Sequence, residues 1–499
     1  MSSSFSLFLM LLRFFPVYVW LLLPLNLWGQ TADKPYFVVA RWTNTQTQWT
    51  MSELRNAYQQ SQVAVWQPIK PALDAYFEAN NTFVINDWQA LANLPANTLC
   101  ISDLDHLNPQ FKVLWIDGQD FFENAAQYPF YQKLPRAPFR TNIVPMFRDG
   151  LFYTHHLRVV GDELRWVNKY FPDSDTQIPA RKINQTAQFD FEGQITKLML
   201  TGVSAITRRT GAAADAYGVG YLTEKVLSFF QNADWVHLSN EVSIVPDCQY
   251  ASSGTKFCTK EAHFQALLDL RVNIVELTGN HNSDYGRQYF DQTLAWYKAH
   301  QIPTFGGGSN AQLANEPLII TLKDGKKIGF IGFNEQCPLG ECAEGSTAGA
   351  NRYEAAKAQA AILKMRSQAD FIIASVQFRE RDSYEPRTEQ VQICRDLADF
   401  GADMVYGSQA HQVQQVAFYN QKPLFYGLGN FLFDQQHHIG VRQGFFLKLF
   451  FYQGKLIQAV PVFTMIDAGR PVLATPAETD QIKAAIWLDG LLYPTQNRK

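Results

Sequence analysis

Cysteine is scarce in this chain, with 6 among 499 residues, which excludes a small domain held together by disulfides. Only 18% of residues are charged; the 43 basic and 46 acidic residues leave a net charge of −3. No block of basic residues occurs, so nucleic acid is not an expected partner. Internal repeats and low-complexity tracts are also lacking. What is abundant is apolar: 46% of residues are hydrophobic and 37 are Phe, enough to offset chain entropy in a folded protein.

Long hydrophobic runs are confined to the N-terminus, which excludes a protein with several membrane spans. The densest run covers residues 14–28, is interrupted by Pro16 and Pro24, and follows Arg13. Its length suits a secretory signal, but no small-x-small cleavage pattern follows it. Residues 1–32 are therefore either a signal peptide or an N-terminal membrane anchor. In both cases Arg13 stays cytoplasmic and the rest of the chain is extracytoplasmic.

Export permits disulfides. Cys248 and Cys258 bracket a loop-like stretch rich in small residues, and we predict that they pair. Cys337 and Cys342 flank a short segment with Pro and Gly and form a second candidate pair. The alternatives are free thiols or a metal site, although neither pair has the two-residue spacing typical of zinc sites.

The length, at ~150 residues per domain, suggests about three units. We expect a smaller α/β domain over residues 35–184, a larger one over 195–470 and a tail over 471–499. Residues 173–194 are polar with little periodicity, which is typical of a linker.

The larger region alternates short apolar runs with amphipathic segments, which predicts an α/β fold with buried strands. The expected strands are 195–201, 235–238, 274–277, 327–333, 371–376 and 404–406, and the clearest helices are 355–367 and 387–400. In such folds, function collects at the carboxyl ends of the strands. Polar residues follow the strands at these points: Glu241, Asn280, His281, Gln377, Glu380, Gln409 and His411.

The most informative motif is the stretch 278–286, TGNHNSDYG, which contains Asn280 and His281 just past a strand. Asn supplies a carbonyl oxygen ligand and His can contact a phosphoryl oxygen or donate a proton, as in a dinuclear metal site. A plain turn is the alternative, because Asn and His are common in loops.

This motif does not stand alone. Six further short motifs lie before and after it in the chain. They are Gly-Val at 202–203, Ser-Asn-Glu at 239–241, Val-Gln-Phe-Arg-Glu at 376–380, Gly-Ala-Asp at 401–403, Gly-Ser-Gln-Ala-His at 407–411 and Gly-Leu-Gly-Asn-Phe at 427–431. Over about 270 residues this region resembles the CapA family of capsule and poly-γ-glutamate synthesis proteins. The resemblance implies a calcineurin-like metallophosphoesterase fold, an α/β sandwich, and a role with capsule or another envelope polymer.

The chain departs from the family pattern at three ligand positions. The family's Asp after the first strand is Val203 here, and two family His residues are Gln377 and Gln409. Valine cannot bind a metal, and glutamine offers only a neutral oxygen. We therefore expect either one divalent ion (Mn, Zn or Fe) or none, and not the ion pair ~3.5–4 Å apart of a two-metal phosphoesterase.

Two readings follow from these substitutions. In the first, the altered centre recognises an anionic envelope polymer or glycan by hydrogen bonds, through Ser204, Gln377, Gln409 and Asn430. In the second, the protein is a hydrolase of metallophosphoesterase type, or one that uses a metal-free acid/base pair. The catalytic candidates are His281, Glu241 and Glu380, and the metal-ligand candidates are Glu241, Asn280 and His411. A structural remnant is the third possibility.

Three weaker features remain. His437 and His438 form a reserve metal site or a solvated loop pair, and Arg208 with Arg209 forms a solvated pair or a contact for an anionic polymer. Pieces of the first region, such as residues 51–58 and 113–118, resemble a phosphate-type periplasmic solute-binding domain. That region is thus either a binding module or a spacer.

Overall fold

A computed structural model provides the structure of the chain. It describes residues 36–41, 44, 48–87, 90, 91, 94, 95, 97–123, 125, 143–148, 151–160, 163–168, 191–250 and 254–486. The expected leader at 1–32 lies outside these residues, as does most of the expected linker at 173–194. Within the part of the chain that is described, no helix combines the length and the apolar character needed to cross a membrane.

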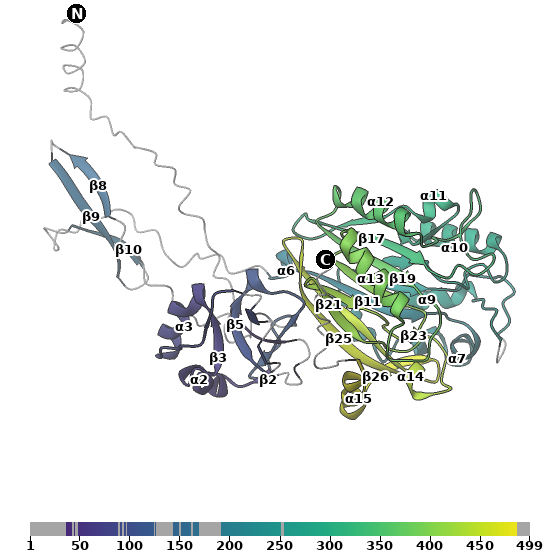
Figure 1. Ribbon diagram of the computed structural model, residues 1–499, viewed down its shortest axis with the longest axis horizontal. Coiled ribbons are helices and arrows are strands. Elements are labelled where there is room, and N and C mark those ends of the chain that lie inside the picture. The colour runs from purple at the N-terminus through teal and green to yellow at the C-terminus, as the bar shows by residue number, and fades with distance from the viewer. Residues whose placement is uncertain are drawn as a thin grey trace, which may run out of the picture. The chain divides into compact units, whose positions relative to one another are not determined.

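The first region folds as a small α/β unit (Figure 1). Its main sheet has the order β4-β3-β5-β1-β6. The strands are β1 (Tyr36–Arg41), β3 (Val63–Trp66), β4 (Val84–Ile85), β5 (Leu99–Asp103) and β6 (Phe111–Val113), and a separate pair joins β2 (Gln48–Trp49) to β7 (Trp115–Ile116). The helices are α2 (Met51–Gln59) and α3 (Lys70–Phe77).

Helix α2 begins where the sequence provides a capping box. The Thr50 hydroxyl accepts from the Glu53 backbone N–H at 3.1 Å, and the Glu53 carboxylate accepts from the Thr50 N–H at 2.8 Å. These bonds satisfy backbone donors that the first helical turn leaves without partners.

A three-stranded antiparallel sheet, formed by described residues between 143 and 168, belongs to a different compact unit. Its order is β10-β9-β8, formed by β8 (Ile143–Arg148), β9 (Leu151–Val160) and β10 (Glu163–Asn168). The described residues of the first region up to residue 125 and those from residue 191 onward together form the other compact unit.

The second region contains two mixed sheets. The first has the order β14-β13-β12-β11-β24-β25-β26, with β23 paired to β11. Its strands are β11 (Thr196–Ser204), β12 (Trp235–Asn240), β13 (Ile274–Glu276), β14 (Thr304–Phe305), β23 (Asn430–Leu432), β24 (Gln443–Tyr452), β25 (Lys455–Asp467) and β26 (Arg470–Leu473). The second sheet has the order β16-β17-β19-β20-β22-β21. Its strands are β16 (Leu318–Thr321), β17 (Lys327–Asn334), β19 (Phe371–Gln377), β20 (Met404–Ser408), β21 (Val416–Tyr419) and β22 (Lys422–Phe425).

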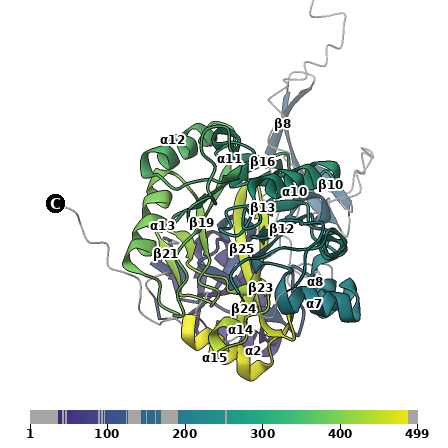
Figure 2. The ribbon, with the colours of Figure 1, turned by 90° about the vertical axis from the view of Figure 1, so that its right-hand side faces the viewer.

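Helices flank these sheets. They are α6 (Phe191–Gln194), α7 (Arg208–Tyr217), α8 (Leu227–Phe230), α9 (Gln265–Asp269), α10 (Arg287–Ala299), α11 (Ala311–Ala314), α12 (Ala355–Arg366), α13 (Thr388–Phe400), α14 (Ile439–Arg442) and α15 (Pro476–Ile486). A small two-stranded sheet joins β15 (Gly307–Gly308) to β18 (Gly349–Ala350). Figure 2 shows α12 and α13 on one side of the strands and α7 and α8 on the other.

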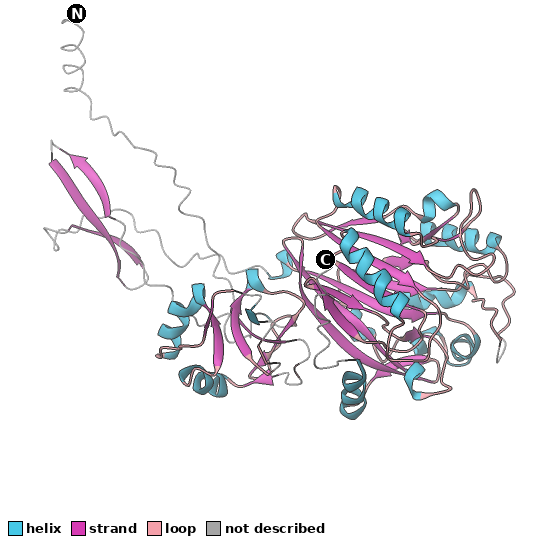
Figure 3. Cartoon of the chain, viewed as in Figure 1, coloured by secondary structure: helices cyan, strands magenta, loops and turns pink. Residues whose placement is uncertain are grey.

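Alternation along the strands explains this layering, because successive side chains of a strand point to opposite faces. Leu200 of the first sheet and Ile373 of the second belong to one buried cluster between the sheets. Their neighbours Met199 and Ile372 belong to two other clusters, which pack against the outer helices. The result is a helix–sheet–sheet–helix sandwich, in which the strands form the interior and the helices the outside (Figure 3).

The predicted α/β sandwich is confirmed. Each of the six strands predicted for the larger region is present, and the helices predicted at 355–367 and 387–400 are α12 and α13. Both regions also touch within their compact unit. The side-chain oxygen of Gln458 accepts from the Val113 N–H at 2.9 Å, and its amide nitrogen donates to the Phe111 carbonyl at 3.3 Å.

Candidate functional site

The candidate site lies where strands of both sheets end. The residues that end or follow β12 and β13 in the first sheet, and β17, β19 and β20 in the second, carry polar side chains at these points: Asn240, Glu241, Asn280, Asn334, Gln377 and Gln409. Parallel strands bring their carboxyl ends to one edge of a sheet, and the two facing sheets bring the two edges together. Segments more than a hundred residues apart in sequence therefore meet here.

The amide nitrogen of Gln377 is the centre of this cluster. It donates to Glu241 Oε2 at 3.0 Å and to Asn280 Oδ1 at 3.1 Å, and it also contacts Gln409 Oε1. Three oxygens from three separate segments thus converge on a single nitrogen that has only two hydrogens to share. An amide N–H₂ group carries partial positive charge. The Gln377 amide nitrogen therefore occupies the position that a cation would take among these three oxygens.

The orientation of the Gln377 amide is set by Asn334, at the end of β17. Asn334 Nδ2 donates to Gln377 Oε1 at 2.7 Å and to the Thr278 carbonyl at 2.8 Å, while Asn334 Oδ1 accepts from the Cys337 N–H at 2.6 Å. Reversing the Gln377 amide would bring its N–H₂ group against the Asn334 N–H₂ group. Orientation is assigned from such networks, and this one admits a single arrangement.

Glu241 is the buried charge of the site, with 2% of its surface exposed. Burial raises the pKa of its carboxyl group because desolvation disfavours the charged form. Its Oε2 accepts from Gln377, whereas Oε1 has no hydrogen-bonding partner among the described residues. The close approach of the motif at 278–286 requires Gly279, since a Cβ there would lie 2.4 Å from Glu241 Cβ.

His281 is held by a carboxylate. Its Nδ1 lies 2.8 Å from Asp284 Oδ2, which also accepts from the Phe257 N–H at 2.7 Å, and its ring contacts the Phe257 ring at a centroid distance of 4.1 Å. Burial acts to lower the pKa of His281, but the Asp284 bond and the Glu241 charge raise it above its usual value. The arrangement resembles the orientation of a general acid or base by a neighbouring carboxylate.

His411 and Gln409 lie in a strained turn after β20. Their φ angles are +55° and +75°, in the left-handed region that non-glycine residues rarely adopt. His411 Nδ1 lies 2.8 Å from Asn430 Oδ1, and the ring stacks on Phe433 at 5.1 Å. Backbone strain of this kind persists only where contacts with the surrounding structure hold the residue in that conformation.

Not all of the predicted residues join this network. Glu380 is 59% exposed in its side chain, and its Oε1 lies 3.9 Å from His411 Nε2. Ser204 is buried and its hydroxyl has no partner within the described part of the chain. Val203 is also buried, as suits an aliphatic side chain at a strand end.

Cys248 is joined to Cys258, the pairing that the sequence favours, and Cys337 is joined to Cys342. Both loops border the site. Phe257, next to Cys258, contacts His281 through its ring, and Glu341, next to Cys342, accepts from the Ser283 N–H at 2.9 Å. Burial raises the pKa of Glu341 to about 7.

Sequence patterns did not single out Asn334 or Glu341, and they predicted a solvated pair or a polymer contact for Arg208. Asn334 directly follows the predicted strand 327–333, so its position was a usable signal. Arg208 is not a solvated surface residue: its side chain is 16% exposed and pairs with the buried Asp434. No pattern in the chain indicates that pairing, because the partners are 226 residues apart.

The resemblance to metallophosphoesterases implies a metal at these strand ends, and the residues present do not fit one. The three converging oxygens are already bound to the Gln377 amide nitrogen. An ion at the centre would have to displace Gln377, whose amide Asn334 prevents from reversing. The centre is thus suited to hydrogen bonding and not to metal coordination.

A family model described as "Bacterial capsule synthesis protein PGA_cap" matches residues 193–435. The PGA biosynthesis protein CapA of Bacillus subtilis is 24% identical over 220 residues, which cover 44% of this chain and 58% of that protein. The capsule biosynthesis protein CapA of Bacillus anthracis is 24% identical over 249 residues, covering 48% and 60% respectively. The chain therefore spans less than two thirds of either relative.

Among solved structures, a 5'-nucleotidase precursor from Thermus thermophilus is similar, with 14% identity and a TM-score of 0.35. The similarity covers 58% of this chain and 57% of that one.

Proposed function

Residues 193–435 of this chain belong to the family of bacterial capsule synthesis proteins, and on that premise we propose that the protein handles capsule, poly-γ-glutamate or another anionic envelope polymer. It does so by binding or assembly, outside the cytoplasm, and not by two-metal hydrolysis.

The observation that carries this proposal is the hydrogen-bonded Gln377 amide. Two-metal phosphoesterases need two cations clamped by ionised and imidazole ligands. Here Glu241, Asn280 and Gln409 direct oxygens at a neutral amide, and Val203 cannot serve as a ligand. Glu241 Oε1, Ser204 Oγ and Ser408 Oγ are buried polar atoms without partners among the described residues, whereas buried polar groups of native proteins usually have one.

Two features support the extracytoplasmic location. The apolar segment within residues 1–32 suits a signal peptide or a membrane anchor. Two disulfides near the site also suit an oxidising compartment.

The test combines polymer binding, turnover and metal binding on the full-length chain in detergent. Calorimetry should show that poly-γ-glutamate binds more tightly than poly-α-glutamate, which has the same charge and a different backbone. No new amino groups should appear during incubation with the polymer. Polymer cleavage would contradict binding as the role of this site, and equal affinity for both polymers would contradict recognition of the γ-linked backbone.

A double variant tests whether the strand-end centre binds a metal ion. Wild type should take up no Mn²⁺ at the strand-end centre, whereas Gln377→His combined with Gln409→His, which replaces two amides by imidazoles, should gain Mn²⁺ binding. Mn²⁺ bound by wild type and lost in Glu241→Gln would show that the amides do not exclude the ion.

A hydrolase is the second candidate, favoured by the His281–Asp284 pair and by the buried Glu241 carboxyl nearby. Such a pair can act as acid and base on a polymer bond. His281→Ala should abolish turnover in a hydrolase, whereas in a binding protein it should change affinity only. Turnover that survives this substitution would remove His281 from any catalytic role.

A further inference from the structure

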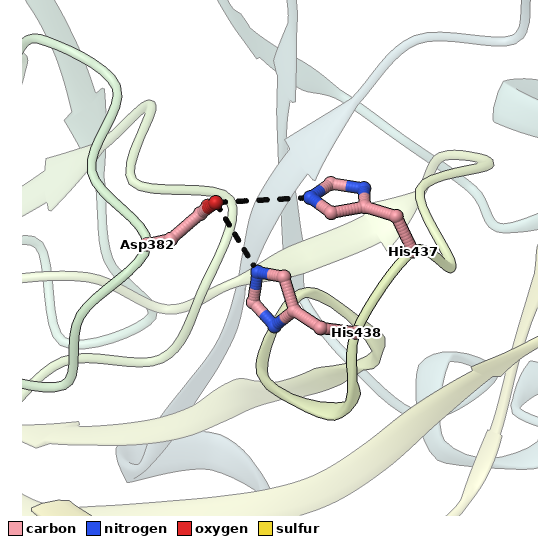
Figure 4. A group of neighbouring side chains, drawn as sticks. All are labelled: Asp382, His437 and His438. Atoms are coloured by element: carbon pink, nitrogen blue, oxygen red, sulfur yellow. Dashed lines mark ion pairs between the residues drawn. The ribbon is translucent and has the colours of Figure 1, made fainter.

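Two loops at the rim of the site bring three metal-binding side chains together. Asp382 follows β19, and His437 and His438 follow β23, between Asp434 and α14. Asp382 Oδ2 lies 3.7 Å from His437 Nε2 and 3.3 Å from His438 Nε2 (Figure 4). One ligand atom from each residue lies within 4.8 Å of the others, and among the described residues this is the one such His/Cys/Asp/Glu group.

The geometry directs the three side chains toward one point. Figure 4 shows both imidazole rings turned toward the Asp382 carboxylate. The backbone N–H of Gly440 donates to His438 Nδ1 at 3.1 Å, which orients the ring and leaves Nε2 facing Asp382. His438 Nε2 is inaccessible to solvent and makes no regular hydrogen bond within the described chain, although Asp382 lies close enough for an ion pair.

The surroundings leave room for an ion and for its remaining ligands. Asp382 and His438 line a hollow of about 440 Å³, together with Tyr384, Gln412 and Gly440. The side chains of Asp382 and His437 are 52% and 56% exposed, so an ion can enter from solvent. Three protein donors leave at least one position of a tetrahedral ion open, as in zinc sites that bind a further ligand.

We propose that Asp382, His437 and His438 bind one divalent transition-metal ion. Two imidazoles and a carboxylate suit Zn²⁺, Ni²⁺ or Cu²⁺, and they do not suit Mg²⁺ or Ca²⁺, which prefer oxygen ligands only. None of the three residues contributes to the Gln377 network. The rim site is therefore separate from the strand-end centre and does not rest on the proposed polymer role.

Metal binding at His438 Nε2 has a local consequence. While Nδ1 accepts from Gly440, the proton of the neutral ring is on Nε2. Coordination of the neutral ring through Nε2 moves that proton to Nδ1, and a protonated Nδ1 no longer accepts from Gly440. Ion binding should therefore alter the first turn of α14, with the Gly440 amide as its reporter.

The test is a Zn²⁺ titration of the full-length chain, purified without a His tag or chelator. Calorimetry should show one ion per chain. His437→Ala and Asp382→Asn should each weaken binding by about 10–100-fold or more, the usual cost of losing even an outer-shell partner. His300→Ala is the matched control, because His300 is an exposed histidine that stacks on Trp296, and it should leave the affinity unchanged.

X-ray absorption at the zinc edge supplies a second readout, with two imidazole nitrogens and at least one oxygen expected. Gln377→Ala should leave zinc binding intact, which separates this proposal from the one for the strand-end centre. Absence of zinc uptake, or uptake equal in wild type, His437→Ala and Asp382→Asn, would overturn the rim site and leave an exposed ion pair only.

Discussion

The guanidinium carbon of Arg208 lies 4.7 Å from the ring centroid of Phe257. It also lies 5.1 Å from the ring of Phe433. Phe257 in turn contacts His281, and Phe433 stacks on His411. One arginine therefore links the aromatic supports of both site histidines, which come from segments far apart in the chain.

Arg208→Met should destabilise the fold and loosen both histidines. Arg208 pairs with Asp434, whose side chain is 5% exposed, and removal of the arginine leaves that carboxylate buried without its charge partner. Breaking a buried pair in this way costs about 3 kcal/mol. Chemical denaturation measures the loss, and NMR of the imidazole protons should report shifts at His281 and His411.

Arg209→Met is the matched control, because Arg209 contacts Asp434 through its backbone N–H and not through its side chain. Equal denaturation midpoints for Arg208→Met and Arg209→Met would refute the role assigned to the Arg208 guanidinium.

Tyr406 lies in the buried cluster between the two sheets, and Tyr406→Phe should lower the free energy of unfolding. The Tyr406 hydroxyl donates to Glu276 Oε2 at 2.9 Å and lies 3.0 Å from His237 Nε2, and Glu276 and His237 are fully buried. Loss of the hydroxyl leaves a buried charged acceptor short of a donor, at a cost of about 1–3 kcal/mol. Tyr419→Phe removes an exposed hydroxyl bonded to Asp399 and should cost much less.

The same cluster predicts sensitivity to acid. Burial acts to raise the pKa of Glu276, but His237 and the hydrogen-bond donors around the carboxylate hold it below its usual value of 4.5. A depressed folded-state pKa contributes stability above the unfolded pKa, and that contribution is lost as the pH falls through the folded value. Unfolding free energies should therefore fall below about pH 4.5, and Glu276→Gln should flatten that decline. An unchanged slope in Glu276→Gln would show that other carboxyl groups cause it.

Glu341→Gln should act in the opposite pH range. Burial raises the pKa of Glu341 from 4.5 to about 7, so the folded protein favours its protonated form. The stability from this group is present below pH 4.5 and is lost as the pH rises toward 7. Glutamine keeps an oxygen that can accept from Ser283 and carries no charge, so the variant should be more stable than wild type by about 1–3 kcal/mol at pH 8.

Urea denaturation of Glu341→Gln and wild type at pH 4 and pH 8 measures this difference. The two proteins should have similar midpoints at pH 4 and separate at pH 8. A variant less stable than wild type at pH 8 would mean that the Glu341 charge contributes favourably to the fold.

Much of the framework follows from local sequence. Apolar runs such as 371–376 end at a polar residue, and the structure places β19 at Phe371–Gln377. The predicted helix at 387–400 matches α13 because its apolar positions recur at helical spacing and Gly401 follows it. Parallel strands in one sheet also explain why Glu241 and Asn280 meet.

What the tertiary structure alone decided is which atom each polar group faces. Glutamine presents an oxygen on one side and a nitrogen on the other, so the residue type at 377 suits either a metal ligand or a donor. The choice depends on Asn334, which is 43 residues away and occupies the oxygen. Likewise, only the folded chain brings Asp382 to His437 and His438 and pairs Arg208 with Asp434. Short-range patterns determine strands and helices, whereas hydrogen bonds and ion pairs act over a few ångströms between segments that only the packing of the two sheets brings together.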